Sequence, residues 1–244
     1  MRYRTEWEKT IKINLLGFKC PLPVLKANHL IKQYRSNGKS VCALLVDPTS
    51  PFTKGAVLGD RIRMKEFYDD KSTFIRSIAS RGSKGGLCEN IDNIAAILEY
   101  AGFDIIIYET VGVGQVELDV VESVDTVIVV LVPESGDDIQ IMKAGLIEIA
   151  DIYVINTCSV TDNADKKCDK LVRSLKNKNP NSFIVVTGCY AQLQHRKLSK
   201  NQDINLVVGT EKKLDIPKIV IDQLNVDYVS ETNKIKIFDL SYSL

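Results

Sequence analysis

The feature that most constrains the fold is a series of apolar, β-branched runs, many of them spaced far enough apart for a helix to fit between them. Each run is apolar almost throughout, with no polar residue at every second position. This pattern is typical of parallel strands that helices cover on both faces. We therefore predict an α/β fold with a doubly wound, mostly parallel sheet. The runs are residues 41–47, 103–110, 126–133, 151–157, 183–188 and 204–210.

Helical periodicity fills several of the intervals between these runs. Asp162 or Asn163 can cap the last of the predicted helices, and Pro180 follows its end. Near the C-terminus, KIKIFDL at 234–240 alternates between polar and apolar residues and predicts an edge strand. The predicted helices span residues 23–34, 91–101, 139–150 and 164–178.

Composition indicates a soluble protein with a sizeable core. The chain has 244 residues, 45% of them hydrophobic, and its 32 Lys and Arg against 31 Asp and Glu leave no net field toward membrane or nucleic acid. It contains no run of 18 apolar residues, and its start, MRYRTEWEKTIKI, is too polar for a signal peptide. We therefore expect a cytoplasmic protein whose six cysteines are free thiols, catalytic groups or metal ligands.

Cys20 lies in LLGFKCPLPVLKANHLIK, directly before a Pro-Leu-Pro sequence and a helical pattern. A thiol at a helix start is close to free N–H groups, which stabilise its thiolate. The segment, about residues 12–34, resembles the sulfur-carrier proteins of the TusA type. The resemblance implies that Cys20 carries a persulfide for a tRNA-thiolation partner. The alternative is a helix-start cysteine with no partner to receive sulfur.

A longer resemblance covers about residues 38–156. Its blocks are VDPTSPFTKGAVLGDRIRM, FIRSIASRGSKGGL, GFDIIIYETVGVGQVE and PESGDDIQIMKAGLIEIADIYVIN. They resemble, in the same order, G proteins of the ArgK/MeaB family, which chaperone cobalamin-dependent acyl-CoA mutases. The resemblance implies a P-loop-NTPase-like middle that continues into a second, Rossmann-like α/β unit, with GTP or GDP and Mg²⁺ as ligands and an acyl-CoA mutase as partner.

The stretch that follows Glu109 has the character of a phosphate-sensing switch. Glu109 ends a buried strand, and Gly112 and Gly114 allow the backbone to approach a γ-phosphate. Gln115 and Glu117 resemble switch residues that report nucleotide state to a partner. The alternative is an ordinary loop beside solvated acidic strand ends. By resemblance, the nucleotide would contact Gly112, Gly114, Gln115 and Asn156, and Mg²⁺ would be held by Asp47, Asp60 and Glu109.

Two parts of a working GTPase are missing from the sequence. No Gly-x-x-x-x-Gly-Lys-Ser/Thr occurs, so the amide cradle, the phosphate-binding lysine and the Mg²⁺-binding hydroxyl have no source. Asn156 is followed by Thr157, Cys158 and Ser159, without the lysine and aspartate of a guanine-reading element. We therefore predict that GTP hydrolysis is lost or impaired.

From Asn156 onward the chain resembles another family. NTCSVTDNADKKCDKLVRSLKNKNPNSFIVVTGCYAQL and VVGTEKKLDIPKIV resemble the N-terminal domain of radical-SAM tRNA methylthiotransferases of the threonylcarbamoyl-adenosine branch. This resemblance covers about residues 151–244 and implies that Cys158 and Cys189 are two of three ligands of an auxiliary [4Fe-4S] cluster. The third ligand is missing, as is the Cys-x-x-x-Cys-x-x-Cys of the SAM-binding cluster, so the ligand set is incomplete.

The remaining cysteines and the histidines carry weaker signals. Cys168, within DKKCDK, is predicted to be a surface residue rather than a cluster ligand. Cys42 and Cys88 are read as ordinary small side chains, and His29 and His195 as isolated surface or packing residues. The basic stretch KKCDKLVRSLKNK is predicted to be the solvated face of an amphipathic helix, with contact to RNA phosphates as the alternative.

The chain therefore reads as three joined segments: 1–37, 38–156 and 157–244. The leading hypothesis is a chaperone-like protein related to the G proteins. The second is a tRNA sulfur-modification protein or accessory, and the third is a non-functional fusion product. If the protein is an enzyme, it is GTPase-like or methylthiotransferase-like, and neither class has all of its motifs here.

Overall fold

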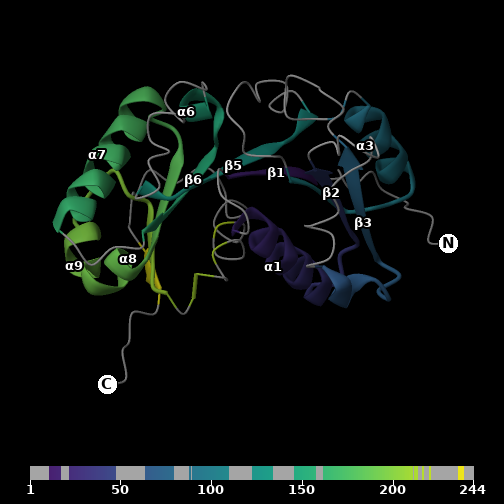
Figure 1. Cartoon of the computed structure of the whole chain (residues 1–244), viewed down its shortest axis with the longest axis horizontal. Coiled ribbons are helices and arrows are strands. Elements are labelled where there is room, and N and C mark those ends of the chain that lie inside the picture. The colour runs from purple at the N-terminus through teal and green to yellow at the C-terminus, as the bar shows by residue number, and fades with distance from the viewer. Residues whose placement is uncertain are drawn as a thin grey trace, which may run out of the picture. The chain divides into compact units, whose positions relative to one another are not determined.

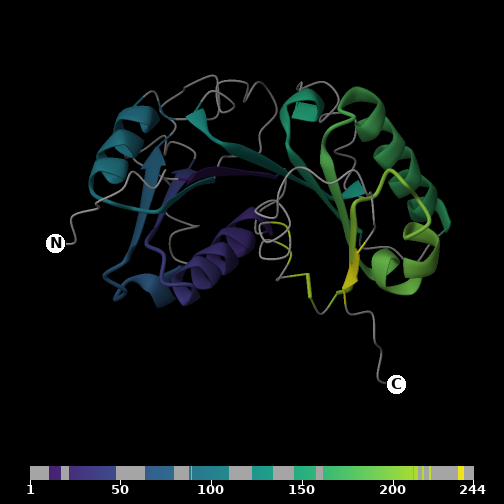
Figure 2. The same cartoon turned by 180° about the vertical axis from the view of Figure 1, so that it is seen from behind.

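The computed structural model divides into two compact units, Met1–Val127 and Ile128–Leu244, each of which is described by itself. Both contain parallel strands and helices (Figures 1 and 2). The three-segment division of the sequence remains a prediction. The structure describes residues 11–17, 22–47, 64–79, 88, 90–109, 123–133, 146–157, 162–210, 212, 213, 216, 220 and 236–238.

The first unit is built on four parallel strands in the order β3-β2-β4-β1. Ile107 of β4 is the register partner of Ile13 in β1 and of Ala43 in β2. Figures 1 and 2 show α1 and α3 on opposite sides of these strands. The strands are β1 (Ile11–Gly17), β2 (Val41–Asp47), β3 (Thr73–Ala79) and β4 (Ile105–Glu109), and the helices are α1 (Leu22–Ser36), the 3₁₀ turn η1 (Lys65–Phe67) and α3 (Ile91–Tyr100).

The core of this unit follows from the apolar pattern. Residues 41–46 of β2 are all buried, as expected for a strand with helices on both faces. The side of α1 that packs against β1, β2 and β4 buries Ala27, Leu30, Ile31 and Tyr34, which recur at helical spacing. On the other face, the ion pair between Lys12 Nζ and Glu99 Oε1, 2.6 Å apart, links β1 to α3.

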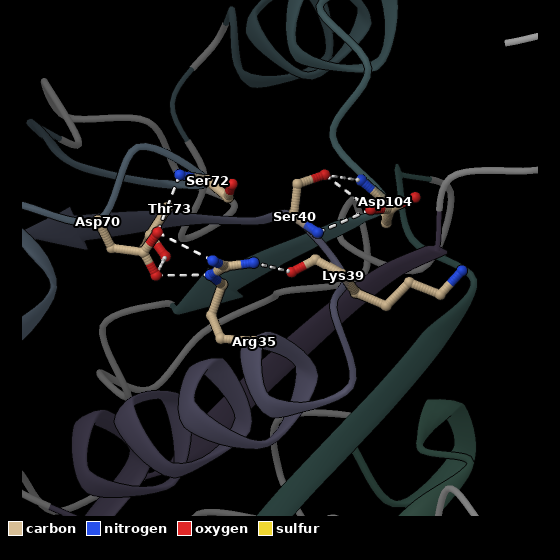
Figure 3. Close-up of polar contacts among 7 residues, drawn as sticks. All are labelled: Arg35, Lys39, Ser40, Asp70, Ser72, Thr73 and Asp104. Carbon is tan, nitrogen blue, oxygen red and sulfur yellow. Dashed lines mark hydrogen bonds and ion pairs between the residues drawn. The ribbon is translucent and has the colours of Figure 1, made fainter. Parts of the chain in front are cut away.

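A polar network joins the amino ends of the strands in this unit (Figure 3). Arg35, in the last turn of α1, donates from Nε and Nη2 to the two carboxylate oxygens of Asp70, at 2.5 and 3.0 Å, and from Nη1 to the carbonyl of Lys39 at 2.8 Å. Asp70 also accepts from the backbone N–H of Ser72 and the hydroxyl of Thr73, just before and at the start of β3. The network therefore fixes the end of α1 against the start of β3.

Three hydrogen bonds between Ser40 and Asp104 extend this network to the neighbouring strands. The backbone N–H and the hydroxyl of Ser40, just before β2, both donate to Oδ2 of Asp104 at 2.7 Å, and the backbone N–H of Asp104 donates to the Ser40 hydroxyl at 3.0 Å. Asp104 directly precedes β4. Because β2 and β4 are adjacent, these bonds satisfy polar groups that would otherwise be left at the strand starts.

The second unit has strands in the order β5-β6-β7-β8-β9, and its described pairings are all parallel. α7 buries its apolar side at Leu171, Val172 and Leu175. The described part of the chain contains no helix of the length and apolar character needed to span a membrane. The elements are β5 (Thr126–Leu131), α6 (Leu146–Ile149), β6 (Ile152–Thr157), α7 (Asp162–Lys178), β7 (Phe183–Gly188), α8 (Cys189–Leu193), α9 (His195–Leu198), β8 (Leu206–Val208) and β9 (Lys236–Phe238).

Most predicted elements are confirmed, including the edge strand near the C-terminus, which forms β9. Two strands, β1 and β3, were not predicted. The prediction that Cys168 lies on the surface is wrong: its side chain is fully buried. It stands three, four and seven residues before Leu171, Val172 and Leu175, so the helical period places it on the packed face. Of the helix predicted at 139–150, the described residues show Leu146–Ile149.

Candidate functional site

The carboxyl ends of β1, β2 and β4 meet at one edge of the first unit. Glu109, the last residue of β4, is the register partner of Leu15 in β1 and of Leu45 in β2. Only 6% of Glu109 is exposed. Ligands of open parallel sheets bind at this edge, and a carboxylate is the kind of ligand that Mg²⁺ prefers. The structure therefore places one predicted Mg²⁺ ligand, Glu109, at the edge where open parallel sheets bind their ligands.

The connection between β1 and α1 leaves from this same edge. β1 ends at Gly17 and α1 begins at Leu22, so four residues, 18–21, join them. A phosphate-binding motif of the Gly-x-x-x-x-Gly-Lys-Ser/Thr type would lie here, at the strand-to-helix turn, and run into the first turn of the helix. In this chain the turn carries the sequence Phe-Lys-Cys-Pro. The sequence of the connection that follows β1 thus lacks the motif that binds phosphate.

Several predicted site residues fall outside the described residues. Asp47 ends β2, two residues beyond the register partner of Glu109, but only its backbone is described. Within the described ranges, no cluster of three or more His, Cys, Asp or Glu residues could hold a metal ion. The metal, nucleotide and sulfur sites therefore remain predictions. The residues outside are Cys20, Asp60, Gly112, Gly114, Gln115, Glu117 and Cys158.

In the second unit, β6 and β7 end side by side. Asn156 is the register partner of Thr187, and Thr157 of Gly188. The hydroxyl of Thr157 donates to the carbonyl of Thr187 at 2.7 Å and is buried. Asn156 is half-buried at this edge. The Thr157 hydroxyl is therefore used inside the sheet, and the contact of Asn156 with a base stays a prediction.

Gly188 lets the two strand ends lie this close together. Its φ is 99°, a conformation that glycine adopts at little cost, and a Cβ added there would lie 1.9 Å from the carbonyl oxygen of Thr157. The next residue, Cys189, begins α8 and is exposed. Each of the register partners Thr157 and Gly188 thus precedes a cysteine in the sequence.

A charged group near Cys189 was not foreseen from the sequence. Lys197 of α9 donates from Nζ to the hydroxyl of Tyr190 at 2.9 Å and to Oδ2 of Asp169 at 3.0 Å. These two hydrogen bonds raise the pKa of Lys197 above its ordinary value, while burial raises the pKa of Tyr190. The sequence did not predict this contact, because α9 has only four residues and is too short for an apolar period that would identify it as a helix.

Comparison with known proteins supports the G-protein resemblance. A family model described as methylmalonyl-CoA mutase-associated GTPase MeaB matches residues 24–196. The match runs beyond the predicted 38–156 at both ends. A Pyrococcus abyssi protein whose name includes the word GTPase is 56% identical over 127 residues, covering 52% of this chain and 39% of the relative. The GTPase ArgK of Escherichia coli is 43% identical over 119 residues, covering 49% of this chain and 36% of the relative.

The chain thus spans about two fifths or less of the length of these curated relatives. Among solved structures, the hydrogenase maturation factor HypB from Archaeoglobus fulgidus is similar, with a TM-score of 0.56 at 19% identity over 87% of this chain and 90% of that one. This similarity confirms the predicted P-loop-NTPase-like α/β fold with parallel strands. Since the family model matches well over half of the sequence, the chain belongs to the family of methylmalonyl-CoA mutase-associated GTPases of the MeaB type.

Proposed function

We propose that the chain is a chaperone-like member of this family that associates with an acyl-CoA mutase and that its GTP hydrolysis is lost or strongly impaired. The observation that carries the proposal is the four-residue connection between β1 and α1. It leaves the carboxyl edge beside the buried Glu109, where the family fold would place the phosphates. Glu109, the predicted cation ligand, therefore stands beside a connection whose sequence lacks the phosphate-binding motif.

The carboxyl end of β6, where a guanine-reading element would begin at Asn156, supports the same proposal. In the position of the lysine of an Asn-Lys-x-Asp element stands Thr157, whose hydroxyl is buried and bonded to the Thr187 carbonyl. Ser159 stands in the position of the aspartate and has no carboxylate for a base. Both the phosphate and the guanine contacts are therefore reduced, and binding and turnover should fall together.

A GTPase assay with Mg²⁺ tests the loss of hydrolysis. We expect turnover at least about two orders of magnitude below that of E. coli ArgK under the same conditions, because removal of a single group that stabilises the transition state already has an effect of this size. Any residual rate should be the same in Glu109→Gln. Tight GTP binding with turnover that Glu109→Gln abolishes would show that the site is intact and that the proposal is wrong.

The mutase association has a separate readout. The chain should co-elute with purified methylmalonyl-CoA mutase in size-exclusion chromatography, with or without GTP, since the proposed association does not depend on nucleotide. A chain that elutes alone under both conditions would contradict the association and leave the prediction about hydrolysis as it stands.

A second candidate function is sulfur or iron–sulfur chemistry in tRNA modification, and one observation favours it. Thr157 and Gly188 are register partners, and the sequence places Cys158 and Cys189 immediately after them, with Cys189 exposed. Adjacent parallel strand ends can bring two thiolates to one edge of a sheet. Cys20, in the β1–α1 connection of the other unit, would be the sulfur carrier in this interpretation.

Anaerobic reconstitution with iron and sulfide tests this candidate. The full chain should develop the broad visible absorption of an iron–sulfur cluster, and Cys189→Ala should lose most of it. Cys88→Ala is the matched control, because Cys88 is a partly exposed free thiol in the other unit. Absence of the absorption, or its equal loss in both variants, would exclude a cluster held by Cys189.

A further inference from the structure

The outer face of α7 carries a continuous stripe of positive charge. Lys166, Lys170 and Arg173 are all exposed and recur at intervals of four and three residues, so they lie on one face of the helix. That face is opposite the side of α7 that packs into the second unit. The packed side consists of Cys168, Leu171, Val172 and Leu175.

Two acidic residues of α7 border this stripe, and both are half-buried: Asp165 and Asp169. Asp169 lies three residues after Lys166 and four before Arg173, so it is the acidic neighbour nearest the stripe among those whose side chains are described. Oδ2 of Asp169 accepts the hydrogen bond from Lys197 at 3.0 Å. On the same flank, Lys176 donates to the carbonyls of Pro180 and Ser182. The charges on the flank are thus engaged locally, whereas those at the centre of the outer face are basic.

The neighbouring helix carries further exposed basic residues. The ion pair between Lys197 and Asp169 joins α9 to α7, and Figure 1 shows the two helices side by side. Arg196 of α9 and Lys200 just after it are both exposed. We define the basic face as Lys166, Lys170 and Arg173 of α7.

We propose that the basic face binds the phosphate backbone of double-helical RNA. From Lys166 to Arg173 the stripe runs about 10 Å along the helix axis, long enough for its side chains to reach more than one phosphate. Exposed Lys and Arg clustered on one side of a domain form the electrostatic footprint of a nucleic-acid-binding surface. This role goes beyond the proposed mutase association and uses neither Glu109 nor the cysteines.

Other occupants fit the basic face less well. A membrane surface would need apolar side chains to insert, and the described outer face of α7 presents Lys166, Lys170 and Arg173 at its centre instead. The core of a protein interface is typically depleted in Lys. The major groove of DNA admits a helix that protrudes, whereas α7 lies with its apolar side packed in its own unit. The wide, shallow minor groove of A-form RNA, bordered by phosphates, accepts a surface that does not protrude.

A binding assay with matched charge variants tests the proposal. Fluorescence anisotropy would follow a labelled RNA hairpin titrated with the full chain at several salt concentrations. For Lys166→Gln, Lys170→Gln and Arg173→Gln combined, we expect the Kd to rise about tenfold or more and the slope of log K against log salt to fall by about 2, since three phosphate contacts are removed. Lys166→Arg combined with Lys170→Arg should keep binding, because it keeps the charge.

The matched control removes the same charge from the other unit. Lys65, Lys71 and Arg76 are exposed there, and replacing all three by Gln should leave the Kd within about twofold. Circular dichroism of every variant should match that of the parent chain. The proposal is overturned if the hairpin does not bind, if the control weakens binding equally, or if a DNA duplex of the same length or anionic vesicles bind as tightly as the RNA.

Discussion

Gly188→Ala should destabilise the second unit by about 3–5 kcal/mol, in the range reserved for a severe packing conflict. An added Cβ would lie 1.9 Å from the carbonyl oxygen of Thr157, a backbone atom that cannot turn aside. To make room, β6 and β7 must separate at their carboxyl ends, which breaks the bond between the Thr157 hydroxyl and the Thr187 carbonyl. The backbone conformation, with φ at 99° and ψ at −166°, adds a second cost for alanine, because essentially only glycine adopts it.

Gly102→Ala is the control for a glycine that has a positive φ but no close neighbour. Gly102 has a similar φ of 89°, but a Cβ added there meets nothing within 4 Å. We therefore expect a loss of only about 1–2 kcal/mol, from the backbone conformation alone. Urea-induced unfolding, read by hydrogen exchange of peptides from each unit, would compare the two variants. Equal losses would mean that the close approach of β6 and β7 does not limit the choice of residue at 188.

Arg35→Met should lower the stability of the first unit by about 1–3 kcal/mol at neutral pH, because it removes two charge-assisted hydrogen bonds to Asp70 and one to the Lys39 carbonyl. Lys32→Met is the matched control one turn earlier on α1. Lys32 pairs with Glu66 at 2.8 Å, but the two side chains are 51% and 47% exposed. The loss of this solvent-screened pair should change stability by less than about 1 kcal/mol.

The same variant should change the response to acid. The hydrogen bonds from Arg35, followed by the one from the Ser72 backbone, lower the pKa of Asp70 from its ordinary 3.8 to about 2. A carboxylate with a lowered folded-state pKa stabilises the fold above its unfolded pKa, and this contribution is lost as the pH falls from about 4 through about 2. Urea unfolding between these values should show a shallower pH dependence for Arg35→Met. An unchanged dependence would mean that other groups hold the Asp70 carboxylate.

The sequence predicted the buried strands well and the partly exposed ones poorly. β2, β4, β5, β6 and β7 are apolar over most of their length, as is typical of buried parallel strands, and that pattern is local to each segment. β3, with the sequence TFIRSIA, has exposed residues at Phe74 and Arg76 and lies at the edge of its sheet, so its apolar signal is diluted. β1 owes its identity to pairing with β4, more than 90 residues further along the chain, which no local pattern reveals.

For the candidate site, the sequence predicted which residues end the strands but not the contacts between neighbouring strand ends. Glu109 could be placed because it terminates an apolar run, and the structure confirms that it is buried at the carboxyl edge. The bond from Thr157 to Thr187 depends on the register of β6 against β7, which is a non-local property. The burial of Cys168 could have been predicted from its helical spacing from Leu171, Val172 and Leu175. The charged neighbours in DKKCDK favoured an exposed position instead.

The polar network of Arg35, Asp70, Ser40 and Asp104 lies at the amino ends of the strands, whereas Glu109 and the connection after β1 lie at the carboxyl ends. Selection for a foldable unit and selection for a ligand therefore act on different residues. Substitutions in the loops at the carboxyl ends can therefore change or remove ligand binding without breaking the hydrogen bonds at the amino ends. The parallel sheet then persists and can acquire another ligand.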